Sequence, residues 1–261
     1  YGINNGGIAN IIGGSIIRGN DNNYSYGTLY NSGTINIGTK DGNVSKESPV
    51  ITGATYGIQN SGTFNFYDGI IKGKTNAING VVTEIEEGYE IIKETIESYE
   101  VKYLDKLPIA KLVNKDKEYT DLQEAINDAE TGETIEILRD ATFISTTETF
   151  EVPESKNIII DIKGYTLTRA NSTLLNNKGI LEIKDSGKGE EGSKTYGKLE
   201  NTGGTIIENS GTLRLNNVVV NSNGTVVTTS GILEIINSTM ISSNGTTIIN
   251  SDSGNTTIKS G

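Results

Sequence analysis

The stretch Asn209-Ser210-Gly211-Thr212-Leu213-Arg214-Leu215 places a small turn before alternating apolar and polar residues, and the same phrase recurs along the chain. Two further complete copies are Asn31-Ser32-Gly33-Thr34-Ile35-Asn36-Ile37 and Asn60-Ser61-Gly62-Thr63-Phe64-Asn65-Phe66. Degenerate copies begin at Asn5, Asn177 and Thr229. Self-similarity at a period of about twenty to thirty residues is typical of architectures that grow by stacking. The phrase therefore predicts a solenoid of short strands.

The composition indicates a thin core. Hydrophobic residues make up 34% of the 261-residue chain and aromatic residues 6%, while glycine occurs 32 times and proline 3 times. So few prolines argue against a collagen-like or proline-rich disordered chain. A narrow core of Ile, Val and Leu, interrupted by frequent turns, reconciles these figures.

Missing residue types exclude several kinds of chemistry. The chain has no cysteine, histidine or tryptophan. Without cysteine there are no disulfides, thiolate metal sites or cysteine nucleophiles. Without histidine the commonest acid–base catalyst is missing, which leaves Asp, Lys or Arg chemistry for an enzyme.

The charge argues against two classes of partner. The net charge is −11 and the isoelectric point about 4.6, so the chain repels nucleic acid phosphates and anionic membrane surfaces. No run of about eighteen apolar residues occurs, so no membrane span is expected. No signal peptide opens the chain, and Tyr1 begins inside a repeat. We therefore expect the chain to be part of a longer polypeptide.

Three zones are predicted. Residues 1–80 repeat the phrase and form a first β-helix segment, truncated at its N-terminus. Residues 81–107 are poor in glycine and rich in glutamate, and strand-like runs at 89–92 and 99–103 predict a closing hairpin or linker. A solvated glutamate cap there would prevent strand addition at the end of the segment. Residues 108–261 form a second β-helix segment.

A short helix is predicted at about 120–130, at the start of the second segment. Apolar residues at positions 122, 125, 126 and 129 have helical spacing. Thr120 or Asp121 is placed to accept hydrogen bonds from the first free amides, and Glu124 follows Asp121 by three residues. Gly132 is expected to end the helix in a left-handed conformation.

This helix, followed by Gly132-Glu133-Thr134-Ile135-Glu136-Ile137-Leu138, resembles the N-terminal cap of right-handed parallel β-helices of the pectin-lyase-like superfamily. The resemblance implies that the helix covers the open end of the first coil. The repeats themselves resemble those of bacterial surface proteins and adhesins with this fold. The expected fold is therefore all-β, a right-handed parallel β-helix in two consecutive segments, the second opened by a capping α-helix.

In such a fold, successive coils stack as parallel strands about 4.8 Å apart. The positions expected to point inward and stack are Leu213, Leu215, Leu233 and Ile235, and those expected to point outward are Asn36, Asn65, Arg214 and Glu234. Stacked asparagines are expected to hydrogen-bond along the axis. We expect Asn and Gly in the turns because both residues tolerate a positive φ.

Two groups of residues are candidates for chemistry. Asp161, Glu182 and Asp185, with Lys163 and Arg169 nearby, supply the residue types needed to cleave a polysaccharide, although any polar outer face shows such spacing. The runs Asn20-Asp21-Asn22-Asn23 and Lys40-Asp41-Gly42-Asn43 offer oxygen ligands for calcium, but they match no EF-hand or calcium repeat, and such residues more often form turns. We therefore assign no catalytic, cofactor-binding or metal-binding residue.

The leading hypothesis is a non-enzymatic module of a bacterial cell-surface or secreted protein. It would act outside the cell as an adhesin or stalk and bind a host surface protein, a glycan or a neighbouring cell through loops of unequal length. One alternative is a polysaccharide-binding or polysaccharide-cleaving β-helix of the lyase or hydrolase type, which requires a groove lined by carboxylates and Lys or Arg. Another is a structural segment of a self-assembling fibre.

Overall fold

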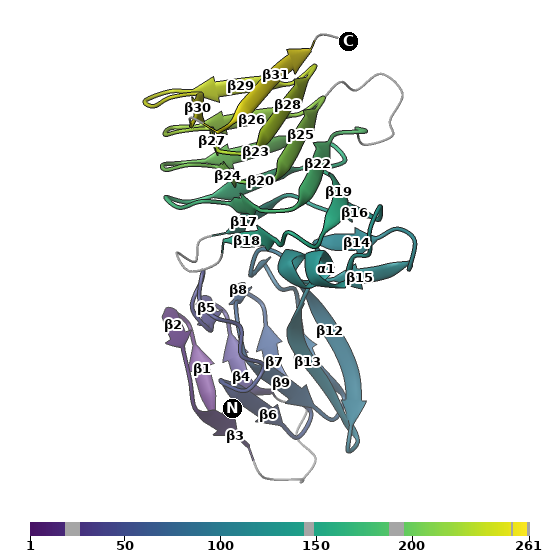
Figure 1. The fold of residues 1–261 in the computed structure, drawn as a ribbon. Coiled ribbons are helices and arrows are strands. Elements are labelled where there is room, and N and C mark those ends of the chain that lie inside the picture. The colour runs from purple at the N-terminus through teal and green to yellow at the C-terminus, as the bar shows by residue number, and fades with distance from the viewer. Residues whose placement is uncertain (19–26, 144–148, 188–195, 252, 260–261) are drawn as a thin grey trace. The chain divides into compact units, whose positions relative to one another are not determined.

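The computed structural model describes residues 1–18, 27–143, 149–187, 196–251 and 253–259. Within these ranges the regular structure is almost entirely β-strand, and most strand pairs are parallel (Figure 1). A single α-helix is present in the described residues. The chain divides into two compact units, Tyr1–Leu107 and Pro108–Gly261.

The first unit repeats three strands, and equivalent strands of successive repeats pair in parallel. Sheet A contains β1 (Ile3–Asn5), β4 (Gly27–Asn31), β7 (Tyr56–Asn60) and β10 (Asn76–Asn79). Sheet B contains β2 (Ile8–Ile11), β5 (Thr34–Ile37), β8 (Thr63–Phe66) and β11 (Glu84–Ile85). Sheet C begins with β3 (Ser15–Ile17), β6 (Val50–Gly53) and β9 (Ile70–Gly73).

Sheet C ends in an antiparallel hairpin, as the runs at 89–92 and 99–103 predict. β12 (Tyr89–Ile96) pairs with β13 (Tyr99–Lys106), and β13 pairs antiparallel with β9. The hairpin therefore covers the edge that the parallel strands of this sheet leave open.

The second unit has the same three-strand period. Sheet D contains β15 (Lys117–Tyr119), β14 (Ala110–Leu112), β16 (Thr134–Ile137), β19 (Asn157–Asp161), β22 (Ile180–Lys184), β25 (Thr212–Asn216), β28 (Ile232–Ile236) and β31 (Asn255–Lys259). Sheet E contains β17 (Ala141–Phe143), β20 (Thr166–Arg169), β23 (Lys198–Asn201), β26 (Val219–Ser222) and β29 (Thr239–Ser242). Sheet F contains β18 (Phe150–Val152), β21 (Leu175–Asn177), β24 (Ile207–Asn209), β27 (Val227–Thr229) and β30 (Ile248–Asn250). Among the described strands of this unit, two pairs are antiparallel: β14 with β15, and β14 with β16.

Helix α1 (Leu122–Asp128) lies within the predicted segment and begins as predicted. The Asp121 carboxylate accepts hydrogen bonds from the backbone N–H groups of Gln123 and Glu124, at 2.6 and 3.3 Å. The apolar positions 122, 125, 126 and 129 are all buried, and the helix packs against β14, β15 and β18. Gly132 has the predicted left-handed conformation, with a φ of +83°, but it does not end the helix, because the chain is already extended at Ala129.

The core consists of columns of side chains in register. Leu213 pairs with Leu233 and Leu215 with Ile235, and all four are buried, which confirms the inward positions. In the first unit Ile35 pairs with Phe64 and Ile37 with Phe66. Identical positions in successive repeats therefore bury each other, and each repeat depends on its neighbours for its core.

Asparagine ladders run beside these columns, as predicted. The Asn5 side-chain amide donates to Asn31 Oδ1 at 2.8 Å, and the Asn31 amide donates to Asn60 Oδ1 at 2.7 Å. In the second unit Asn177 donates to Asn209, which donates to the hydroxyl of Thr229. Because these amides also donate to turn carbonyls, the ladders satisfy backbone groups at the turns as well as one another.

The glycine of the repeated phrase serves a different purpose from the predicted one. Gly33, Gly62, Gly211 and Gly231 do not have positive φ. A Cβ on Gly33 would lie 2.1 Å from the carbonyl oxygen of Gly7, and one on Gly231 would lie 2.0 Å from that of Gly211. The turn needs glycine because the backbone of the preceding repeat leaves no room for a side chain.

We expect Gly33→Ala to destabilise the first unit by about 1–3 kcal/mol, because the added methyl group overlaps the backbone of the preceding repeat. Gly7 occupies the same position in the first copy of the phrase, and a Cβ there would meet nothing within 4 Å. Gly7→Ala is therefore the matched control and should leave stability nearly unchanged. Urea denaturation followed by circular dichroism measures both, and equal losses would contradict the explanation.

Candidate functional site

The predicted carboxylates Asp161 and Asp185 hold turns together. Asp185 is buried and accepts backbone hydrogen bonds from Gly164, Gly187 and Gly197, at 2.7, 2.9 and 2.6 Å. Asp161 is also buried and accepts from the backbone N–H groups of Lys163 and Ser186, at 3.1 and 3.0 Å. Carboxylates bonded in this way are anchors for the backbone, and neither presents a free oxygen pair to a substrate.

Glu182 belongs to a ladder of paired charges on the outer face of sheet D. Arg214 lies between Glu182 and Glu234, with N–O distances of 3.7 and 2.8 Å, and Lys259 contacts Glu234 at 3.2 Å. The hydrogen bond from Arg214 lowers the pKa of Glu234. The face is therefore neutralised by its own side chains.

Lys163 and Arg169 do not join these carboxylates in one cluster. Lys163 lies 3.5 Å from Glu136. Arg169 is fully buried at the end of β20, where its Nε donates to the Ser172 hydroxyl at 3.0 Å. Its two terminal nitrogens have no hydrogen-bond partner among the described residues. The predicted cleavage residues are thus distributed over separate structural roles.

The calcium candidates gain no support from the geometry. Residues 20–23 lie outside the described part of the chain. Asp41 has a φ of +58° and Gly42 donates to the Thr39 carbonyl, so residues 39–42 form a turn. Within the described ranges no three potential acidic ligands lie close enough together to hold a metal ion.

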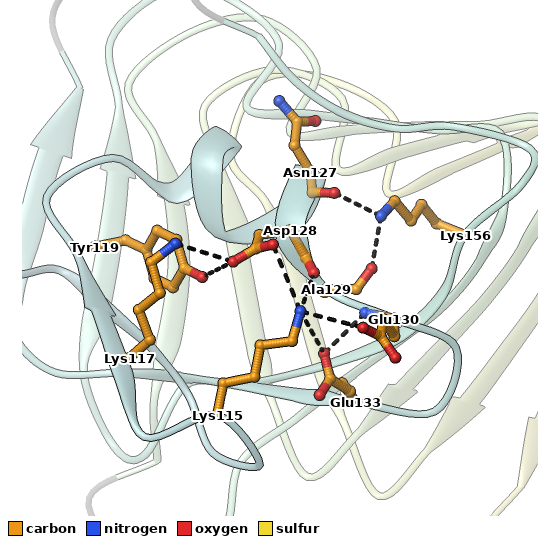
Figure 2. A network of polar contacts seen from close by, with 9 residues as sticks. All are labelled: Lys115, Lys117, Tyr119, Asn127, Asp128, Ala129, Glu130, Glu133 and Lys156. Atoms are coloured by element: carbon orange, nitrogen blue, oxygen red, sulfur yellow. Dashed lines mark hydrogen bonds and ion pairs between the residues drawn. The ribbon is translucent and has the colours of Figure 1, made fainter.

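Helix α1 ends in a polar network (Figure 2). The Lys156 ammonium donates to the carbonyl oxygens of Asn127 and Ala129 at 2.7 and 2.6 Å, and that of Lys115 donates to the carbonyl of Asp128 at 2.7 Å. The last turn of α1 contains no basic residue of its own. Because carbonyls at a helix C-terminus attract cations, these distant lysines stabilise the end of the helix.

The Asp128 side chain connects the same helix to β15. It accepts hydrogen bonds from the Tyr119 hydroxyl and from Lys117, the latter at 3.0 Å, and these bonds lower the pKa of Asp128 to about 2. Burial and the bond to Asp128 raise the pKa of Tyr119. Each group in this network is engaged by another, so we interpret the network as structural.

The outer face of sheet B has a different character. Asn10, Asn36 and Asn65 occupy equivalent positions in β2, β5 and β8 and form a second, outward ladder, the amide row. Asn36 donates to Asn10 Oδ1 at 2.7 Å, and Asn65 donates to Asn36 Oδ1 at 2.8 Å. Glu84 pairs with Asn65 and continues the row into β11.

A hollow opens over the amide row. It has a volume of about 450 Å³ and is lined by Asn10, Ile12, Asn36, Gly38, Thr39, Lys40 and Tyr67. Lys40 forms an ion pair with Glu84, whose other oxygen accepts a hydrogen bond from Tyr67 at 2.9 Å. The bonds from Lys40 and Tyr67 lower the pKa of Glu84. Concave surfaces with a few fixed polar groups are the usual form of ligand sites, so this hollow is the candidate site.

The prediction of a solvated glutamate cap is wrong for Glu86 and Glu100. Glu86 is only 7% exposed and accepts a hydrogen bond from the Asp41 backbone at 3.1 Å, and burial raises its pKa. Glu100 is buried and binds Lys93 and the Ala77 backbone. These glutamates hold the loop after β5 and the edge of β10, and they do not form a separate polar cover.

The sequence pattern predicts that Asn36 and Asn65 lie on the outer face, but no local pattern indicates the hollow. The signal for the amide row was present, because Asn10 stands at the same place in a degenerate copy of the phrase. Lys40 and Glu84 are 44 residues apart, and nothing local indicates their pairing.

Comparisons with models of protein families, with curated proteins and with solved structures found no match for this chain. In the described residues, no helix has the length and apolar character needed to cross a membrane.

The network at the end of α1 predicts a specific acid sensitivity. Hydrogen bonding lowers the pKa of Asp128 from 3.8 to about 2, so its stabilising contribution is complete above pH 3.8 and is lost as the pH falls toward 2. Asp128→Asn should therefore flatten the loss of stability between about pH 4 and 2 in urea denaturation. Glu124→Gln, which removes an exposed carboxylate from the same helix, should keep the slope of the parent chain. An unchanged slope in Asp128→Asn would contradict the assignment.

Proposed function

We propose that both units are right-handed parallel β-helices of the pectin-lyase-like type, in which each three-strand repeat is one coil. The in-register pairing of every third strand and the continuous core columns support this proposal. The hand follows from the strong preference of parallel crossover connections for right-handedness. Helix α1, which packs against β18 of the first coil, acts as the cap.

The function that the geometry supports best is that of a non-enzymatic adhesin or stalk module. One observation supports this proposal most: the candidate catalytic carboxylates already have partners within the fold. Backbone amides bind Asp161 and Asp185, and an ion pair binds Glu182. A stack of coils whose outer face carries an open hollow, as sheet B does, suits the display of a binding surface. We place the module outside a bacterial cell, as part of a longer surface or secreted protein.

Carbohydrate cleavage is the second candidate, and one observation favours it. The pKa of Glu84 is lowered while that of Glu86 is raised by burial, and carboxylate pairs whose pKa values diverge are typical of acid–base catalysis. Against it, both oxygens of Glu84 are already bonded and Glu86 is covered by the loop that begins at Gly38. A catalytic pair needs at least one accessible oxygen at the substrate.

The adhesin proposal is tested by offering the whole chain immobilised glycans and surface proteins of animal cells, and by assaying the same glycans for new reducing ends or unsaturated products. We expect binding without cleavage. Product release that disappears in Glu86→Gln but persists in Glu87→Gln would replace the proposal with the enzymatic one. A chain that binds none of these molecules and cleaves none of them would also contradict the adhesin proposal.

A further inference from the structure

The amide row has hydrogen-bonding capacity that the fold does not use. A carboxamide offers two N–H donors and an oxygen with two lone pairs. In the row, Asn36 uses one N–H donor and one lone pair on its two neighbours, and among the described residues Asn10 accepts one hydrogen bond, from Asn36. Asn31, on the inner ladder of the same repeat, is fully buried, and both of its N–H donors are used: they bond to Asn60 and Thr63, and one of them is shared with the Gly33 carbonyl.

The unused groups face a space of useful size. The hollow of about 450 Å³ over Asn10 and Asn36 is within the range of small-molecule sites. Ile12 at its rim is 72% exposed, which is unusual for an isoleucine and leaves an apolar surface beside the amides. Amide donors and acceptors next to an aliphatic side chain form an amphipathic site.

The charge of the hollow restricts its ligand. Lys40, the one cation in its lining, is paired with Glu84, so it offers no free charge to an anion. The chain as a whole is strongly acidic, which further disfavours anionic ligands. A neutral ligand that both donates and accepts hydrogen bonds matches the remaining groups.

We infer that the amide row and its hollow form a binding site for a neutral, hydroxyl-rich glycan. Sugar hydroxyls both donate and accept, so they complete the bonding of Asn10 and Asn36, and the C–H face of a sugar ring packs on Ile12. Neighbouring strands lie about 4.8 Å apart, which presents one amide to each successive sugar of an extended chain. The inference rests on the proposed adhesin function and names its ligand class.

The site is tested by titrating the whole chain with neutral hexasaccharides of glucose, galactose, mannose and N-acetylglucosamine in a calorimeter, with polygalacturonate as an anionic comparison. We expect at least one neutral hexasaccharide to bind. Asn36→Ala should weaken that binding about tenfold, as expected for two neutral hydrogen bonds. Asn221→Ala, which removes an outward asparagine of sheet E in the second unit, should leave it unchanged.

Thermal unfolding of both variants separates binding from folding. Asn36→Ala breaks the two hydrogen bonds of the row and should lower the melting temperature by only a few degrees, so the chain stays folded at the temperature of the titration. Binding that survives Asn36→Ala and Ile12→Ala unchanged overturns the site, as does a preference for polygalacturonate. The site is also overturned if none of the neutral hexasaccharides binds. The adhesin function itself would survive these results if the chain still bound a surface protein, and would fail with the site if it bound nothing.

Discussion

Parallel hydrogen bonding between each strand and the strand three places further along the chain is the interaction on which the rest of the structure depends. It sets successive repeats about 4.8 Å apart, and every other feature must fit that spacing. The glycines of the repeated phrase are needed because a Cβ would collide with the neighbouring repeat. The core columns exist because the same spacing brings equivalent side chains into contact.

Polar groups in this architecture are satisfied mainly by their counterparts in adjacent repeats. Asn31 and Asn177 bond to the next asparagine and to turn carbonyls, while Arg214 bridges glutamates on either side. An outward residue that keeps hydrogen-bonding capacity beyond such partners is therefore informative. The amide row stands out because its members bond to one another and still retain capacity, next to a hollow with an exposed isoleucine.

Local patterns predicted the features that local chemistry controls. Alternation after the phrase placed Leu213 and Leu233 in the core, and Asp121 marked the start of α1. Gly132 indicates a left-handed turn but not the end of α1, and no local pattern indicates that Lys156, remote in sequence, binds the last carbonyls of the helix. The burial of Glu86 and the pairing of Lys40 with Glu84 depend on how a long loop returns to the sheet, and no periodicity encodes that path. The hollow was unpredictable for the same reason.

The register of the stack is the central claim, and disulfide formation tests it most directly because the chain has no cysteine of its own. Arg214 and Glu234 are in-register neighbours on β25 and β28, so their Cα atoms lie within the range that a disulfide spans. The double variant Arg214→Cys with Glu234→Cys should form an intramolecular disulfide under mild oxidation, detected by peptide mapping. Arg214→Cys with Ile236→Cys places the thiols two residues out of register, about 8 Å apart, and should not. Equal cross-linking in both variants, or none in the first, would contradict the account.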